Sequence, residues 1–450
     1  MTDTKYRYRF LARFVIEAET PIAVGIGEKS IVTDAVVATD INGLPFIPGT
    51  SIAGVVRHIL EEEGVKTDDF FGYQKDDKGK GSKIIFTDAL MVGKEGTAID
   101  GLQTIDFNDG FYAHFKEMPI RQHVRLNEKG TNEKGGKFDE QVVFKGTRFV
   151  FEMEMYAEND DKDKKDFERI TKQLYNSTLR LGGGTRSGFG RIQVIDAKSA
   201  YLDLAQENDL ELYLGKTSSL AQTWKGFQLL TNKPESSDHW QQYTLELEPA
   251  DFFLFGSGFS DAEADMTPTT EASIKWEDGR PEFVEANYII PATSVKGALA
   301  HRTAYYFNKK KKRFADKGWG KAADENEAVK ALFGSSAQHN EDEGTIGNVL
   351  IDDIFIPSKD IEAESKLFNH ITIDRFTGGV KGGALFTEKT TNMRGRRITI
   401  QISVKKSALT DEDIKGAWEQ ALDDLKGGLL PLGGGTNRGN GTFTENNQTY

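Results

Sequence analysis

Alternating apolar and polar residues predict β-strands along much of the chain. The clearest alternation covers residues 6–19 (YRYRFLARFVIEAE), 147–158 (TRFVFEMEMYAE) and 396–404 (RRITIQISV). A period of two residues places every second side chain on one face of a strand. Each stretch therefore predicts a strand with one buried face.

Apolar residues spaced three and four positions apart predict amphipathic helices between these strands. Residues 52–64 (IAGVVRHILEEEG) carry such a stripe, follow Thr50 and Ser51, either of which can cap a helix, and end at a glycine. Residues 166–179 and 411–428 repeat the helical period, and each leads into a glycine-rich loop. The order strand, helix, strands, helix, strand predicts an α+β fold with a ferredoxin-like core and long insertions.

The chain contains the same series of motifs twice. Four motifs keep their order in both halves, and the offset between partners drifts only slightly. LGGGTRSGFG (181–190) matches LGGGTNRGNG (432–441), and IPGTSIAGVVRH (47–58) matches IPATSVKGALAH (290–301). Residues 70–90 match residues 332–355, and residues 123–140 match residues 370–388. Such a repeat predicts tandem copies of one domain. We place the first domain at 1–200, a connector at 201–240 and the second domain at 241–450.

Composition excludes several classes of protein. The 450 residues include no cysteine, which excludes disulfides and thiolate metal sites and fits a reducing compartment. The apolar stretches are too short for a membrane span, and the N-terminal MTDTKYRYRF lacks the apolar core of a secretion signal. We therefore expect a cytoplasmic protein without membrane contacts. The net charge of −13 means that any nucleic-acid site must rest on local features.

The two glycine runs need a reason, because glycine costs backbone entropy and packs no side chain. A nucleotide-binding phosphate loop follows a strand and ends in GK[ST], whereas these loops follow a helix and lack that ending. One alternative is a helix C-cap followed by a flexible turn. The other is a turn whose amides and arginines contact a phosphodiester backbone, and the repetition favours it.

The IPG element, FFG…GSKIIFTDA, ITIDRFTGG…GALFTE and the terminal LGGGTRSGFGRI together resemble the RAMP superfamily. The resemblance covers nearly the whole chain, twice. It is closest to the guide-RNA-binding backbone subunits of type III CRISPR effector complexes. A tandem fusion of two such subunits resembles what some type III-D complexes carry.

The resemblance implies two RNA-recognition-like domains, each with a palm that binds the guide backbone and an inserted β-hairpin thumb that presses between nucleotides. The thumbs correspond to about residues 123–144 and 370–388. The implied partners are CRISPR guide RNA, complementary target RNA and other type III subunits, including the large polymerase-like subunit. The residues implied to bind RNA are Pro48, Gly49, Thr50, Ser51, Gly54, Arg57, Gly182, Gly183, Gly184, Thr185, Arg186, Gly188, Thr293, Ser294, Lys296, Gly297, Gly433, Gly434, Gly435, Thr436 and Arg438.

The resemblance also implies cleavage of target RNA at a loop aspartate with Mg²⁺ or another divalent cation, the target 2′-hydroxyl being the nucleophile. Asp34 occupies this place and is the predicted catalytic and metal-binding residue. Asp40 precedes Ile41-Asn42-Gly43 and suits a turn instead. His123 is a weaker candidate, because a lone histidine is more often structural.

The acid of the second domain that corresponds to Asp34 depends on the residue from which the sequence spacing is counted. Seven residues separate Asp34 from Gly27, and the same count from the matching Gly258 selects Asp265. Counting back from the proline of the IPATS element selects Glu277, and Glu271 lies between the two. The counts differ by 12 because the second domain carries an insertion. We predict Asp265; the alternative is a guide-binding scaffold whose acids are inert.

Overall fold

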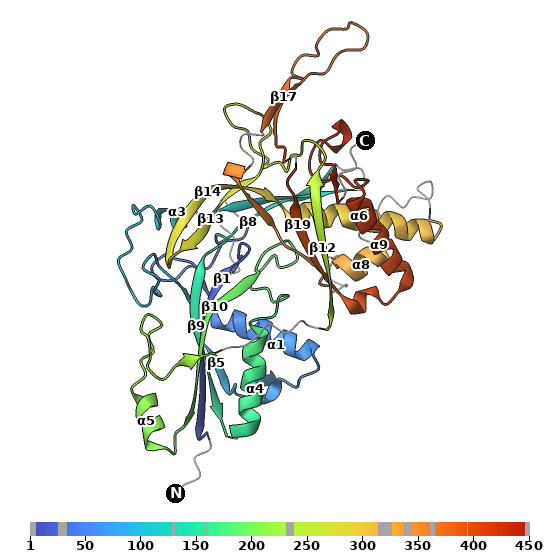
Figure 1. Ribbon diagram of the computed structural model, residues 1–450. Helices are drawn as coiled ribbons and strands as arrows, with labels where there is room; N and C mark the ends of the chain where they lie inside the picture. The colour runs from blue at the N-terminus through green and yellow to red at the C-terminus, as the bar shows by residue number, and fades with distance from the viewer. Residues whose placement is uncertain are drawn as a thin grey trace.

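The computed structural model describes residues 6–25, 34–127, 131–158, 160–230, 238–313, 326–335, 344–360, 365–393 and 395–445. It contains two ferredoxin-like units in tandem, which we call the first repeat and the second repeat (Figure 1). The predicted α+β class is thereby confirmed. None of the described helices is long and apolar enough to cross a membrane.

The first repeat is built on a long antiparallel sheet. Its elements are β1 (Tyr8–Ala18), β2 (Phe46–Ile47), α1 (Gly49–Glu62), α2 (Asp68–Phe71), β3 (Tyr73–Lys75), β4 (Lys78–Lys80), β5 (Ile84–Phe86), β6 (Ala89–Met91), α3 (Ala113–Lys116), β9 (Arg148–Ala157), α4 (Asp160–Gln173) and β10 (Ile192–Asp203). β10 pairs with β1, β1 with β9, and β9 with β5 and β6. This is the ferredoxin-like order. α4 begins and ends about six residues earlier than its periodicity predicts, because residues 174–179 form turns.

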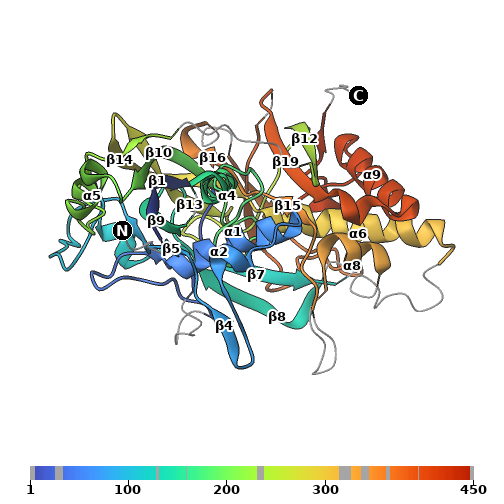
Figure 2. The same cartoon turned by 90° about the horizontal axis from the view of Figure 1, so that it is seen from below.

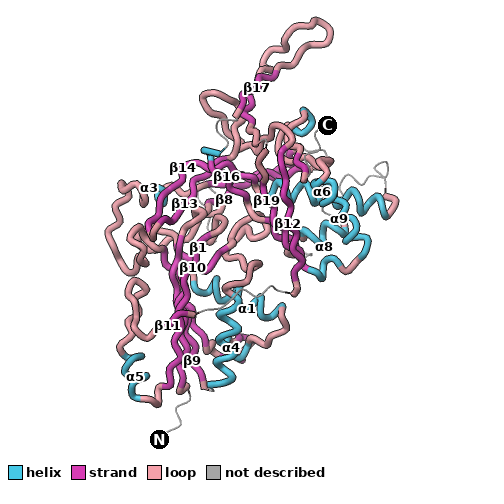
Figure 3. Tube along the Cα trace, viewed as in Figure 1, coloured by secondary structure: helices cyan, strands magenta, loops and turns pink. Residues whose placement is uncertain are grey.

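The second repeat has the same order in shorter strands. Its elements are β12 (Trp240–Pro249), β13 (Thr270–Glu277), β14 (Arg280–Ile290), α6 (Ala292–Lys310), α8 (Glu327–Phe333), β15 (Val349–Ile351), β16 (Ile354–Pro357), β19 (Ile398–Lys405), α9 (Glu412–Lys426) and β20 (Phe443–Thr444). The sheet runs β20–β12–β19–β15. Figure 3 shows α1 and α4 beside the first sheet and α6, α8 and α9 beside the second.

Each repeat carries a β-hairpin thumb, as predicted. The first thumb is β7 (Ile120–Leu126) with β8 (Asn132–Gln141), and Figure 2 shows it best. The second thumb is β17 (Lys366–His370) with β18 (Phe386–Thr390), and it projects far from the second repeat in Figure 1. At its tip the ring of Phe376 is 99% exposed.

The expected insertion in the second repeat is the β13–β14 hairpin, and it docks on the first repeat. The amide of Ile274 donates to the carbonyl of Lys145 (2.8 Å), and the indole of Trp276 donates to the carbonyl of Gly146 (2.8 Å). The ring of Phe283 stacks on His114, with 3.7 Å between centroids. The inserted residues therefore extend the hydrophobic core of the first repeat and join the two units.

The segment that follows β10 packs on the outer face of the first sheet. It contains α5 (Glu207–Leu214) and β11 (Gln228–Leu229), which pairs with β10. Trp224 from this segment is buried against Leu11 and Leu202. In the second repeat the outer face of β12 carries the exposed polar residues Gln242, Thr244 and Glu246, so within the described residues the second sheet lacks such a cover.

Candidate RNA-binding and cleavage site

The loop that carries Asp34 lies against the base of the first thumb. The amide of Asp34 donates to the carboxylate of Asp139 (2.9 Å), and the amide of Asp139 donates to the carboxylate of Asp34 (3.4 Å). Two residues further along β8, the amide of Gln141 donates to the carbonyl of Ala35 (3.0 Å). These contacts hold Asp34 at the root of the thumb. Residues 26–33, including Gly27, lie outside the described residues.

Asp265 occupies the same place in the second repeat. The amide of Thr387 donates to its carboxylate (2.8 Å), and the amide of Asp265 donates to the carbonyl of Thr387 (3.0 Å). The amide of Lys389 donates to the carbonyl of Met266 (2.9 Å), just as Gln141 donates to Ala35. Asp34 and Asp265 are therefore positional equivalents, while their role in cleavage remains a prediction.

The other acids considered from the sequence have different surroundings. Glu271 is buried and pairs with Arg121 (2.5 Å), a residue of the first thumb. Glu277 lies at the end of β13 and pairs with Lys275 (2.5 Å). Asp40 accepts the amides of Asn42 and Leu44 and so forms the turn that its sequence predicts. None of the three takes the position that Asp34 has.

A histidine–glutamate pair ties each thumb to a glycine loop. His123 stacks on Phe138, with 4.8 Å between centroids, and lies 3.1 Å from the carboxylate of Glu140. A Cβ on Gly184 would come within 3.5 Å of that carboxylate. Because successive residues of a strand face opposite sides, Glu140 and His123 face away from Asp139. The contacts of His123 are therefore structural.

The second repeat reinforces this pair with an arginine. His370 stacks on Phe386, with 4.8 Å between centroids, and lies 2.7 Å from the buried carboxylate of Glu388. Arg438, from the second glycine loop, forms an ion pair with the same carboxylate and lies over the Phe386 ring. Arg438 is thus a link between loop and thumb, and any RNA contact that it makes must coexist with this pair.

The glycine runs pack closely on their own repeat. Gly182 has a φ of +88°, and a Cβ there would lie 2.6 Å from the carbonyl oxygen of Ala23. The amide of Gly183 donates to that carbonyl (2.6 Å), and Gly434 makes the same bond to Leu254 (2.7 Å). The expectation that these two amides are available to a phosphate is wrong. The close approach to the chain itself explains the first glycines of each run.

The IPG element also differs from the expectation. Helix α1 begins at Gly49 rather than at Ser51, without a side-chain cap. The amide of Gly49 donates to the carboxylate of Asp88 (2.8 Å), and in the second repeat Ala292 donates to Asp353 (2.7 Å). The first amide of each helix is therefore already occupied by a carboxylate and is not free to bind RNA.

Arg57 is engaged within its own repeat. Its guanidinium pairs with Glu61 and Asp68 (2.8 Å each) and donates to the carbonyl of Gly72 (3.1 Å). These contacts connect α1 to the segment that follows it. A contact of Arg57 with RNA would have to replace them, so the structure favours a structural role over the one implied by the resemblance.

Gly54 and Gly297 occupy equivalent positions in the two repeats, and packing does not explain why either residue is a glycine. A Cβ on either residue would meet no heavy atom within 4 Å. Glycine inside a helix costs roughly 0.5–1 kcal/mol relative to alanine, so a helical glycine beside open space needs another explanation. Space for a ligand to approach the helix backbone supplies one.

Two cations meet where the first glycine loop touches the second repeat. Arg186 donates to the carbonyl of Gly347 (2.6 Å), and burial, together with nearby Arg180, lowers its pKa to about 10. The pKa of Lys296 is also lowered, first by burial and then by the charge of Arg186. Within the described residues neither cation forms an ion pair with a carboxylate, and the charge of Glu62 raises the pKa of Arg186 less than burial and Arg180 lower it. The pair suits a phosphate group.

The remaining predicted residues lie at the starts of helices α1 and α6 and in the two glycine loops. Pro48 and Thr50 are at the start of α1, Thr293 and Ser294 are in the first turn of α6, and Thr185, Gly188, Gly433, Gly435 and Thr436 are in the glycine loops. Gly188 is buried at the contact between repeats, where a Cβ would lie 2.6 Å from both Ala292 and Asp353.

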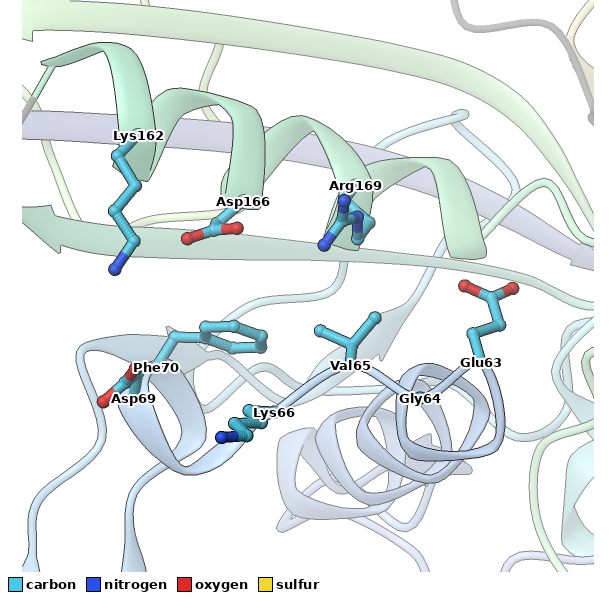
Figure 4. A pocket seen from close by; sticks show the side chains of 9 residues that line it. All are labelled: Glu63, Gly64, Val65, Lys66, Asp69, Phe70, Lys162, Asp166 and Arg169. Atoms are coloured by element: carbon cyan, nitrogen blue, oxygen red, sulfur yellow. The ribbon is translucent and has the colours of Figure 1, made fainter.

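A pocket of about 540 Å³ lies between α4 and the end of α1 (Figure 4). Its charged lining residues are Glu63, Lys66, Asp69, Lys162, Asp166 and Arg169. Acids and bases are balanced there, so the pocket offers no net attraction to a phosphate. None of the predicted site residues lines it.

Known proteins are similar to this chain in sequence. The profile of the RAMP superfamily matches residues 15–193 and again residues 253–444, once in each repeat. The CRISPR system Cms endoribonuclease Csm3 of Methanocaldococcus jannaschii is 30% identical over 211 residues, which cover 44% of this chain and 83% of that protein. The chain belongs to the RAMP superfamily and contains two of its domains in tandem.

Proposed function

We propose that the chain is a backbone subunit of a type III CRISPR effector complex that binds guide RNA and cleaves complementary target RNA. The observation that carries this proposal is the repeated placement of a carboxylate, Asp34 or Asp265, at the root of a thumb. The similarity to Csm3, whose name describes an endoribonuclease, supports the same reaction. The tandem repeat favours a type III-D-like complex in the cytoplasm, with the large polymerase-like subunit among its partners.

Three features support binding of the guide backbone. Gly54 and Gly297 leave open space on α1 and α6, and the cations Arg186 and Lys296 share the contact between repeats. The second thumb presents Phe376 at its tip, where a ring can stack on or between bases. Because the net charge is −13, these local features rather than bulk charge must attract RNA.

In the proposed reaction the target 2′-hydroxyl attacks the adjacent phosphorus, and the bond to the next 5′-oxygen breaks. The products are a 2′,3′-cyclic phosphate and a 5′-hydroxyl. The thumb interrupts stacking so that the attacking and leaving oxygens come into line. The carboxylate of Asp34 receives the proton from the 2′-hydroxyl, and water protonates the leaving oxygen.

Asp34 fits a divalent cation shared with RNA. Mg²⁺ is usually held by one or two carboxylates and completes its shell with substrate phosphates and water. Within the described ranges no three histidine, aspartate or glutamate side chains gather, so RNA would have to supply the other ligands. When bound, the cation would supply positive charge to the phosphate oxygens.

The test is cleavage by the intact complex. The chain is purified with its partner subunits and guide, and labelled complementary RNA is added with Mg²⁺ or with EDTA. We expect cleavage that requires both complementarity and Mg²⁺, with 2′,3′-cyclic phosphate ends. Tight binding of the target without cleavage in Mg²⁺ or Mn²⁺ would instead support the inert scaffold.

One observation favours a scaffold role for the second repeat alone. Thr387 stands where the first repeat has Asp139, so Asp265 has one carboxylate fewer beside it than Asp34 has. If cleavage needs both acids, the second repeat binds RNA without cutting it. Separate mapping of the cuts that depend on Asp34 and on Asp265 distinguishes the two cases.

A further inference from the structure

The junctions between acid loop and thumb differ in one hydrogen bond. In the second repeat, Asp265 and Thr387 are joined through the backbone amide and carbonyl of Thr387. In the first repeat, the amide of Asp34 is bound instead by the side chain of Asp139, at 2.9 Å. The same loop is thus held by main chain in one repeat and by a carboxylate in the other.

The neighbouring residues show why the side chains are not interchangeable. Asp139 has two carboxylate oxygens. Its Oδ1 accepts the backbone amide of Asp34, and its Oδ2 lies 3.4 Å from the side-chain Nε2 of Gln122 on β7, which donates to it. The single hydroxyl of Thr387 donates to Asn369 on β17 (2.8 Å), the counterpart of Gln122. Only Asp139 therefore bridges the neighbouring strand and the acid loop at once.

We infer that Asp139 is a positioning residue, which fixes the backbone of Asp34 and thereby the direction of the Asp34 carboxylate. This inference rests on the proposed function for its effect on cleavage. A carboxylate that accepts a backbone amide makes a stronger bond than a neutral acceptor does. The bond also brings the carboxylates of Asp34 and Asp139 close together, and this repulsion between like charges is unfavourable unless another interaction offsets it.

The predicted effect of losing the bond is confined to the first site. Thr at position 139 ends one atom short of the carboxylate oxygen and cannot reach the amide of Asp34 in the same geometry. A misplacement of about 1 Å can reduce a rate about 100-fold. We therefore expect Asp139→Thr to slow the cut that depends on Asp34 by about 10- to 100-fold in single-turnover assays. The cut that depends on Asp265 should change less than about twofold, within the usual range for a distant site.

Two variants control for chemistry and for folding. Asp139→Asn keeps an oxygen that can accept the amide of Asp34 and should restore the first cut to within about threefold of wild type, since a neutral acceptor is only moderately weaker. Asp77→Thr makes the same change as Asp139→Thr in the exposed turn between β3 and β4 and should leave both cuts unchanged. All variants are measured in the intact complex with bound guide, and target affinity is measured in parallel.

Hydrogen exchange tests the positioning without reference to cleavage. Amides of residues 34–37 should exchange at least about tenfold faster in Asp139→Thr than in wild type, and at nearly the wild-type rate in Asp139→Asn. Unchanged exchange in Asp139→Thr, or an unchanged first cut, would overturn the inference. If Asp34→Ala leaves every cut in place while exchange responds as expected, the proposed function fails and the positioning role stands.

Discussion

The two glycine loops have nearly the same sequence and different surroundings. In the first loop Gly188 is buried against Ala292 and Asp353 of the second repeat. Its counterpart Gly439 is exposed, and a Cβ there would meet nothing within 4 Å. Both loops bond to their own repeat in the same way, through Gly183 and Gly434. Local sequence thus sets the shape of each loop, whereas the neighbouring unit decides what else the loop contacts.

The charges at the bases of the two thumbs also differ between the repeats. Arg121 at the base of the first thumb is buried between Glu271 (2.5 Å) and Asp353 (3.1 Å) of the second repeat. Its counterpart in the second thumb is Phe368, which is partly exposed and packs on Phe252. A buried ion cluster therefore lies at the contact between repeats and has no equivalent at the base of the second thumb, which makes the contact sensitive to charge.

Removing Arg121 is expected to have the largest effect on stability. Arg121→Met would leave two buried carboxylates without their cation and should lower the free energy of unfolding by about 3–5 kcal/mol. Phe368→Leu, at the matching position, should cost less than about 1.5 kcal/mol, because the swap stays apolar. Urea unfolding followed by tryptophan fluorescence compares the two. Equal losses would show that the cluster adds nothing to the contact between repeats.

Asp353 should make stability depend on pH. Burial, opposed by the charge of Arg121, raises the pKa of Asp353 from 3.8 to about 6. Between these values the unfolded chain loses the proton while the folded chain keeps it, so rising pH destabilises the fold. From pH 4 to pH 7 this group should remove up to about 3 kcal/mol. Asp353→Asn should abolish that part of the pH dependence, and parallel curves for the two proteins would contradict the assignment.

Replacing Lys296 should have a smaller effect, which raises the stability of the fold and weakens the binding of guide RNA. Because the pKa of Lys296 is lowered by burial and by the charge of Arg186, the charged form is unfavourable in the fold, and Lys296→Met should stabilise the chain. The same change should weaken guide RNA binding and reduce its salt dependence by about one unit. Lys330→Met, which changes an exposed lysine of α8, is the control. Loss of stability with unchanged guide binding would remove Lys296 from the RNA site.

Much of the fold could be predicted because it is local. The alternation in residues 6–19 and 147–158 identified β1 and β9, and the repeat identified two units. Counting from the glycine end selected Asp265 because the loop leaves β12 at a fixed length. The insertion comes afterwards, as the β13–β14 hairpin, so counting from the proline selected the wrong position.

The partners of charged residues could not be predicted, because they come from distant segments. Arg186 binds Gly347 in the other repeat, and the amide of Gly49 is taken by Asp88, well beyond the end of α1. No periodicity connects such positions. Asp139 did leave a signal, since the aligned FDE and FTE motifs differ only in Asp139 and Thr387. The sequence difference could be interpreted only once the structure had placed Asp139 beside Asp34.

The measurement that tests the central claim most directly is the mapping of target cuts in Asp34→Ala, Asp265→Ala and the double variant. The claim is that the two repeats place equivalent carboxylates at the roots of two thumbs. Each single variant should then lose a different cut and keep guide and target binding, and the double variant should lose both. If Asp34→Ala leaves every cut in place, the first assignment is wrong; if it alone abolishes all cuts, the second repeat only binds RNA.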